Sequence, residues 1–266
     1  MKKLLMVCIS ILILTSCEDV IEVDLNEAPP RLVVEASINI LENGASFNSF
    51  IKLTTTAPFF DNEIPVVEDA SIQIKDEDGM IYPFEHIGSG RYDGLFFPIH
   101  NMEYTLEILY KGETYIGSTQ FESTVPLEYV EQRDDGGFSG EDIELKVFFT
   151  DPVGEGNYYF FKGNSERGLV LDVLSDEFFD GNSIFGYYLV EDLAKGDQVQ
   201  FNLYGIDEAF YNYMFILLQQ TGGGGGPFET QPATVRGNIV NKTNPENYPL
   251  GYFRISELST LSYTVQ

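Results

Sequence analysis

Short runs of alternating apolar and polar residues recur between residues 31 and 125. Five of them are bounded by turn-forming residues: RLVVEASIN, SFIKLTTT, ASIQIKDEDG, EYTLEILYKG and TYIGSTQF. A period of two is typical of strands that bury one face. Asn43-Gly44 and Asp78-Gly79 suit hairpin turns because both dipeptides accept positive φ. The pattern predicts an immunoglobulin-like β-sandwich over 31–126, in which Tyr104 is either a corner tyrosine or an ordinary core residue.

Pro126 marks the expected end of this first unit, because proline cannot donate a hydrogen bond within a central strand. Further strand patterns follow over 143–150 and 157–162, and another begins at Asp197. The sequence therefore predicts a second β-rich domain over 127–266, with a sandwich or a barrel-like form. The linker between the two units is short, so we expect them to pack against each other.

One segment of the second unit has helical spacing instead. Asp207 can cap its start, Glu208 lies in its first turn, and Gly222 follows its end. Its main apolar stripe contains Phe210, Tyr213, Met214 and Leu217. Further apolar residues lie off the stripe: Tyr211, Phe215 and Leu218. We predict a helix over 207–220 that covers a sheet, and the alternative is an exposed docking helix.

The N-terminus has the pattern of an export signal. MKK is basic, residues 4–14 are almost wholly apolar, and small residues precede Cys17. This apolar run is shorter than the ~20 residues that a transmembrane helix needs. LTSC is similar to a bacterial lipobox, which predicts a signal peptide over 1–16, a lipid on Cys17 and a tether over 17–30. The alternative is an ordinary signal peptide that contains a cysteine near its cleavage site.

Cysteine content and charge exclude several classes of protein. Cys8 leaves with the signal and Cys17 carries the lipid, so we expect a mature chain without a disulfide or a cysteine metal site. The full chain has 15 basic and 42 acidic residues and a net charge of −27. Nucleic acid is therefore not an expected partner, since binding there depends on basic residues. Attachment to an anionic membrane must come from the lipid.

Catalytic patterns are weak, and we expect that the protein is not an enzyme. His86 and His100 fit surface or loop positions better than a zinc site, because neither belongs to a helical histidine pair. Ser139 in GFSGE lacks the Gly-x-Ser-x-Gly pattern of a hydrolase. The glycines at 222–226 follow a helix, whereas a phosphate-binding loop precedes one. Paired carboxylates of a glycosidase cannot be judged from sequence, because their spacing is spatial.

Calcium is the metal that the sequence suits best. KDEDGM places Asp76 and Asp78 beside a glycine, and the segment over 133–142 is similarly acidic. Neither has the full spacing of a calcium loop. A hairpin tip is the favoured interpretation of Asp76 and Asp78, and no cofactor other than the covalent lipid is expected.

Longer segments resemble a Bacteroidota outer-membrane lipoprotein family, the domain of unknown function 4249. The resemblance is carried by CEDVIEVDLNEAPPRLVVEASI, FFDNEIPVVEDASIQIKDEDG, GDQVQFNLYGIDEAFYNYMFILLQQ and GPFETQPATVRGNIVN. It implies an outer-membrane location, with the chain anchored by lipid and exposed at the cell surface. Glu18 and Asp19 are similar to the acidic export signal of such lipoproteins.

The resemblance also implies a partner. Members are often encoded beside a TonB-dependent receptor, so the leading hypothesis is a non-enzymatic accessory that helps a TonB-dependent transporter capture or retain its substrate. Aromatic side chains, 16 Tyr and 21 Phe, would supply the contacts. The alternative is a structural or adhesive surface protein. Neither the ligand nor the receptor-facing surface follows from the sequence.

Overall fold

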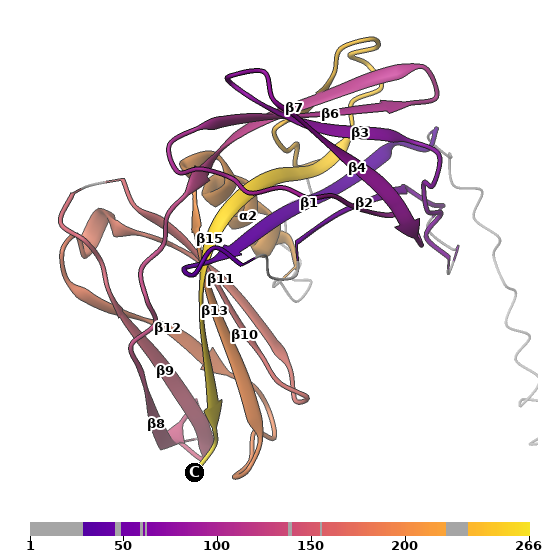
Figure 1. Cartoon of the computed structure of the whole chain (residues 1–266). Helices are drawn as coiled ribbons and strands as arrows, with labels where there is room; N and C mark the ends of the chain where they lie inside the picture. The colour runs from indigo at the N-terminus through magenta and orange to yellow at the C-terminus, as the bar shows by residue number, and fades with distance from the viewer. Residues whose placement is uncertain are drawn as a thin grey trace, which may run out of the picture.

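The computed structural model describes residues 29–45, 49–58, 61, 63–137, 140–154, 156–221 and 234–266. Within these residues the chain is mainly β, as expected, with a 12-stranded sheet, a 3-stranded sheet and the helix α2 (Figure 1). The predicted lipidation and export residues, Cys17, Glu18 and Asp19, lie outside the described residues, as do Ser139 and the glycines at 222–226.

The first unit is a closed ring of eight strands in the described part of the chain. Its hydrogen-bonding order is β15-β1-β2-β5-β4-β3-β6-β7, and β7 pairs again with β15. The strands are β1 (Leu32–Leu41), β2 (Phe50–Thr55), β3 (Ser71–Asp76), β4 (Ile81–Gly88), β5 (Arg91–Asp93), β6 (Glu103–Tyr110), β7 (Glu113–Glu122) and β15 (Leu250–Thr264). The short β14 (Ile239–Asn241) pairs with β7 outside the ring.

The last strand completes this ring. β15 pairs in parallel with β1, from Val33 opposite Leu250 to Leu41 opposite Leu258. A parallel pair needs a long crossover, and here the connection contains the ring strands β2 to β7, the second unit and β14. Phe253 is fully buried in the ring's apolar core, so the C-terminal strand supplies both hydrogen bonds and core volume to the N-terminal unit.

The second unit is a sandwich of two sheets. One contains β8 (Tyr129–Gly136), β9 (Asp142–Thr150) and β12 (Ser183–Leu189). The other contains β11 (Leu169–Ser175), β10 (Tyr158–Asn164), β13 (Gln198–Ile206) and the last part of β15. Inward-facing residues of both sheets form one core, in which Phe149 of β9 meets Tyr159 of β10 with ring centroids 5.1 Å apart. Of the two forms expected for this unit, a sandwich or a barrel-like sheet, the structure has the sandwich.

The helix α2 (Glu208–Thr221) matches its prediction within a residue at each end. Asp207 caps it, because its carboxylate accepts a hydrogen bond of 2.6 Å from the backbone N–H of Phe210. Phe210 and Met214 are buried against the outer face of β10, β13 and β15. The helix covers a sheet as expected, and Phe215 stays half exposed on its other side. Among the described residues, no helix is long and apolar enough to cross a membrane.

Both units share β15, which runs from the ring into the sandwich (Figure 1). The connection from β7 to β8 contains the expected boundary at Pro126. The chain passes from the ring to the sandwich through this connection, which lies next to β15 at the junction.

Candidate functional site

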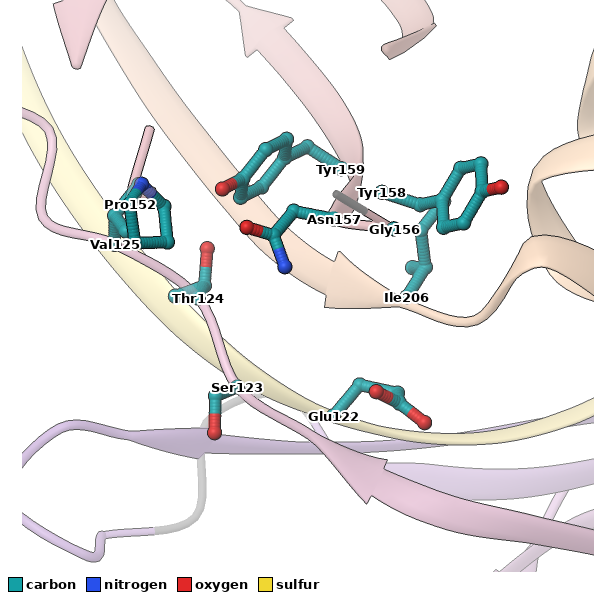
Figure 2. A pocket seen from close by; sticks show the side chains of 10 residues that line it. All are labelled: Glu122, Ser123, Thr124, Val125, Pro152, Gly156, Asn157, Tyr158, Tyr159 and Ile206. Atoms are coloured by element: carbon teal, nitrogen blue, oxygen red, sulfur yellow. The ribbon is translucent and has the colours of Figure 1, made fainter. Parts of the chain in front are cut away.

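A cavity of about 110 Å³ lies at the junction of the ring and the sandwich (Figure 2). Its walls come from the end of β7, the β7–β8 connection, the β9–β10 loop, β10 and the end of β13. The lining residues are Glu122, Ser123, Thr124, Val125, Pro152, Gly156, Asn157, Tyr158, Tyr159 and Ile206. Several of them, including Ser123 and Gly156, are exposed, so the cavity opens to solvent.

The β7–β8 connection is fixed tightly over the end of β13. A Cβ at Gly205 would lie 2.0 Å from the carbonyl oxygen of Ser123, so only glycine allows the two backbones to cross here. The next residue, Thr124, donates its backbone N–H to Oε2 of Glu257 on β15 at 3.0 Å. The connection is therefore held by the close backbone crossing at Gly205 and by a hydrogen bond to the Glu257 side chain.

Two buried polar atoms in the cavity wall have no hydrogen-bond partner among the described residues. They are Oγ1 of Thr124 and Oδ1 of Asn157. Figure 2 shows both side chains in the space between the connection and β10. Leaving a buried polar group unsatisfied costs about 1–3 kcal/mol, and native structures rarely tolerate it without water or a ligand. Both atoms are fully buried, so neither is exposed to the cavity in this structure.

Glu122 supplies the acidic group of the cavity. Burial raises the pKa of its carboxyl, and the negative charge of Asp207 raises it further. No lysine or arginine is found among the residues that line the cavity. The ionised carboxylate thus lacks a positive partner in the cavity, which would make a cation favourable there.

An acidic cluster lies beside the cavity and was not expected from the sequence. Oxygens of Asp151, Asp176 and Asp180 lie within 4.8 Å of one another, and the first two residues are buried. Their carboxylates accept hydrogen bonds from their surroundings, including the hydroxyl of Tyr159 on Asp151 at 2.5 Å and the N–H of Asn157 on Asp176 at 2.9 Å. These bonds position the β9–β10 loop, which brings Asn157 to the cavity.

The structure places Asp76 in the hairpin between β3 and β4. Its carboxylate accepts the N–H of Met80 at 2.8 Å and the hydroxyl of Tyr82 at 3.0 Å. Gly79 has φ +85°, as a hairpin turn requires. Asp78 is exposed and belongs to no group of three possible metal ligands within the described residues. The hairpin-tip interpretation accounts for this acidic turn.

His86 and His100 are both part of local contacts. Nε2 of His86 lies 3.6 Å from Oε1 of Glu68, and the ring packs on Tyr92. The His100 ring stacks on Phe121 with centroids 4.1 Å apart. Neither histidine joins a group of three possible metal ligands in the described ranges.

His100 also connects Ser123 to Glu257. Its Nδ1 lies 3.0 Å from Oγ of Ser123, and its Nε2 lies 3.8 Å from Oε1 of Glu257. The second distance exceeds a hydrogen bond, so the carboxylate does not orient the imidazole as in a hydrolytic triad. Through these contacts His100 holds the loop between β5 and β6 against the junction.

Tyr104 has the geometry of a corner tyrosine. Its side chain is fully buried, and its hydroxyl accepts the backbone N–H of Ile99 at 2.8 Å. A hydrogen bond from the ring to the backbone a few residues upstream is the defining feature of such a corner. Of the two sequence interpretations, the structure supports this one.

These observations define a mainly β protein made of a ring and a sandwich, with a polar cavity at their junction. The chain belongs to the family described as domain of unknown function (DUF4249), whose model matches residues 18–262. This match confirms the resemblance seen in the sequence. No curated protein sequence is significantly similar to the chain.

Two solved structures are similar to parts of the chain. A two fibronectin type III domain segment from chicken tenascin is 14% identical, with 67% of this chain and 91% of that chain covered and a TM-score of 0.21. A cytokine receptor complex is 10% identical, with 68% and 86% covered and a TM-score of 0.25. Scores this low carry no argument about function or overall arrangement.

Proposed function

We propose that the protein is a lipid-anchored accessory of a TonB-dependent transporter at the surface of the outer membrane, where it captures or retains the transported substrate without catalysis. The junction cavity is the observation that carries the binding role. It is open to solvent, and both polar and apolar side chains line it. Preformed cavities with a few polar groups in apolar walls are typical of small-molecule sites.

The membrane part of the proposal is supported by the sequence pattern at the N-terminus and by the family resemblance. Cys17 would carry the lipid, and residues 18–30 would connect it to β1 at Leu32. Such a tether would keep both units outside the bilayer while holding them close to a receptor. The full chain has a net charge of −27, and a body this acidic would be repelled by anionic headgroups and would stay in solution above them.

The export part is tested with the double variant Glu18→Ala and Asp19→Ala. We expect the variant to be acylated normally but protected from protease added to intact cells. The matched control is Glu22→Ala with Asp24→Ala, which removes the same charge a few residues further along the tether. Equal protease sensitivity of the wild type and the first variant would contradict the role of Glu18 and Asp19 as an export signal.

The partner role is tested by native gel electrophoresis of outer membranes dissolved in mild detergent. The chain should migrate in a complex much larger than its own 29.9 kDa. Migration as an isolated chain under several mild detergents would contradict the accessory role. It would favour a structural or adhesive surface protein, whose contacts do not need a stable receptor complex.

A further inference from the structure

We propose that a second cavity, at the end of the ring opposite the junction, binds the carboxylate of a small anion with a short apolar body. This cavity has a volume of about 210 Å³ and shares no lining residue with the junction cavity. Its walls come from β14 and from the segments on either side of it. Two of its residues, Tyr248 and Pro249, directly precede Leu250, where β15 enters the ring, whereas β15 pairs with the sandwich strand β13 from Leu258 onward.

Tyr248 packs between two arginines at this end of the ring. Cζ of Arg236 lies 3.7 Å from the centroid of the Tyr248 ring, and Cζ of Arg31 lies 3.8 Å from it. Two guanidinium groups do not fit on one face at these distances, so each face of the ring carries one of them. Nη1 of Arg31 also donates to the backbone carbonyls of Glu246 at 3.0 Å and Tyr248 at 3.3 Å. Arg31 thus holds the ring in place, and the ring supports Arg236 at the cavity wall.

The guanidinium of Arg236 has donors without acceptors. Its side chain makes no hydrogen bond or ion pair within the described part of the chain, and the residue is exposed to solvent. Acidic residues outnumber basic ones by 42 to 15, and the exposed Arg133 and Arg167 are each paired with an aspartate. An arginine presents parallel N–H groups that match the two oxygens of a carboxylate. A carboxylate can therefore reach Arg236 from solvent and bind it through two hydrogen bonds.

Apolar side chains beside Arg236 select the body of the ligand. No acidic residue lines the cavity, and the apolar part of its wall consists of Ile239, Val240, Pro245 and Pro249. The volume of about 210 Å³ is many times the ~10–15 Å³ that a single water needs, so an alkyl chain of several carbons fits. One arginine balances one negative charge, and the net charge of −27 opposes a second. These features favour a short-chain monocarboxylate over a phosphate dianion.

Hydrogen bonds hold the cavity wall in shape without a ligand. Oε2 of Glu113, at the start of β7, accepts Nδ2 of Asn241 at 3.0 Å and Nδ2 of Asn247 at 2.6 Å. The same oxygen accepts the hydroxyl of Tyr115 at 2.7 Å. Glu113 does not line the cavity, so its charge is used in these bonds rather than in the wall. The segment between β14 and β15 is therefore fixed to β7, and little order has to be gained on binding.

The test is calorimetric titration of the full-length lipidated protein, in a non-ionic detergent, with sodium butyrate and with butyramide as the neutral molecule of the same shape. We expect saturable binding of butyrate. Butyramide should bind at least about tenfold more weakly, and Arg236→Gln should weaken butyrate binding by a similar factor, since one hydrogen bond between charged groups contributes this much.

Arg91→Gln is the matched control. Arg91 is also exposed, and its Cζ lies 5.0 Å from the centroid of the Phe50 ring, but it does not line this cavity. Its replacement should leave butyrate binding unchanged. Tyr248→Phe should also retain binding because the ring remains, whereas Tyr248→Leu should weaken it although Arg236 is present.

Four results would each overturn the proposal: no saturable binding of butyrate, equal binding of butyramide, unchanged binding by Arg236→Gln, or an equal loss in Arg91→Gln. Sodium phosphate that binds as tightly as butyrate would overturn the assignment to a carboxylate. Circular dichroism checks that each variant folds, and Tyr248→Leu supplies the second measure if Arg236→Gln does not fold. The site depends neither on the junction cavity nor on a receptor, so a negative result here leaves the proposed transporter role to its own test.

Discussion

Replacement of Gly205 by alanine tests whether the junction is built as described. The added Cβ would lie 2.0 Å from the carbonyl oxygen of Ser123, 2.4 Å from its carbonyl carbon and 3.0 Å from the carbonyl oxygen of Glu122. All three are backbone atoms, so no side-chain rotation can relieve the contact. Restoring a separation of about 3.5 Å requires a backbone shift of more than 1 Å in a well-packed region.

Overpacking of this kind costs about 1–3 kcal/mol, and a clash with backbone belongs at the upper end. The lower entropy of alanine in the unfolded chain returns about 0.4–1 kcal/mol. We therefore expect Gly205→Ala to lower the free energy of unfolding by about 2 kcal/mol, measured by urea denaturation followed by circular dichroism. The same variant should also weaken any ligand binding in the junction cavity.

Gly168→Ala is the matched control. Its Cβ would meet only the side chain of Val190, with Cγ1 at 3.0 Å and Cβ at 3.3 Å, and no backbone atom. The control should change the free energy of unfolding by less than about 1 kcal/mol. If Gly205→Ala proves no more destabilising than Gly168→Ala, the tight crossing of Ser123 over β13 is wrong.

Three further predictions follow from single groups. Asp207→Ala should lower the free energy of unfolding by about 1 kcal/mol in urea denaturation, because it removes the cap on Phe210, whereas Asp207→Asn should retain most of it. The pKa of Glu122 is higher in the folded protein than its ordinary value of 4.5, so the protonated carboxyl stabilises the fold at low pH and this contribution is lost as the pH rises through the folded pKa. Glu122→Gln, which stays neutral, should therefore be more stable than the wild type at pH 7. It should also flatten the melting-temperature profile over this pH range. A fluorophosphonate probe should not label Ser123, since His100 and Glu257 do not form a triad, and labelling detected by mass spectrometry would contradict the non-enzymatic account.

Local patterns predicted the strands and the helix well. Alternation over RLVVEASIN corresponds to β1, and the Asp207 cap and apolar stripe correspond to α2. The Asp78-Gly79 dipeptide predicted the hairpin turn, in which Gly79 has a positive φ. These features depend on neighbours in the sequence, so a single sequence contains the information that specifies them.

Closure of the ring could not be predicted in the same way. β15 pairs with β1 more than two hundred residues earlier, and the parallel register of Val33 with Leu250 leaves no local signal. Because β15 belongs to both units, a single boundary at Pro126 does not separate them completely. Long-range pairing of this kind is visible only in three dimensions.

The junction cavity was also beyond sequence reasoning. Glu122, Thr124 and Asn157 are three polar residues among many, and nothing in their spacing marks them. Their shared property is that the fold brings them together while leaving two acceptor atoms unsatisfied. The close approach permitted by Gly205 was equally hidden, because glycine occurs at 25 positions in the chain.

The most direct test of the proposed function is affinity purification of the tagged, lipidated protein from its native outer membrane in mild detergent, followed by quantitative mass spectrometry. The account predicts that a TonB-dependent receptor is recovered in a fixed ratio to the protein. Recovery of the protein without such a receptor, from membranes in which receptors of this class are abundant, would contradict it.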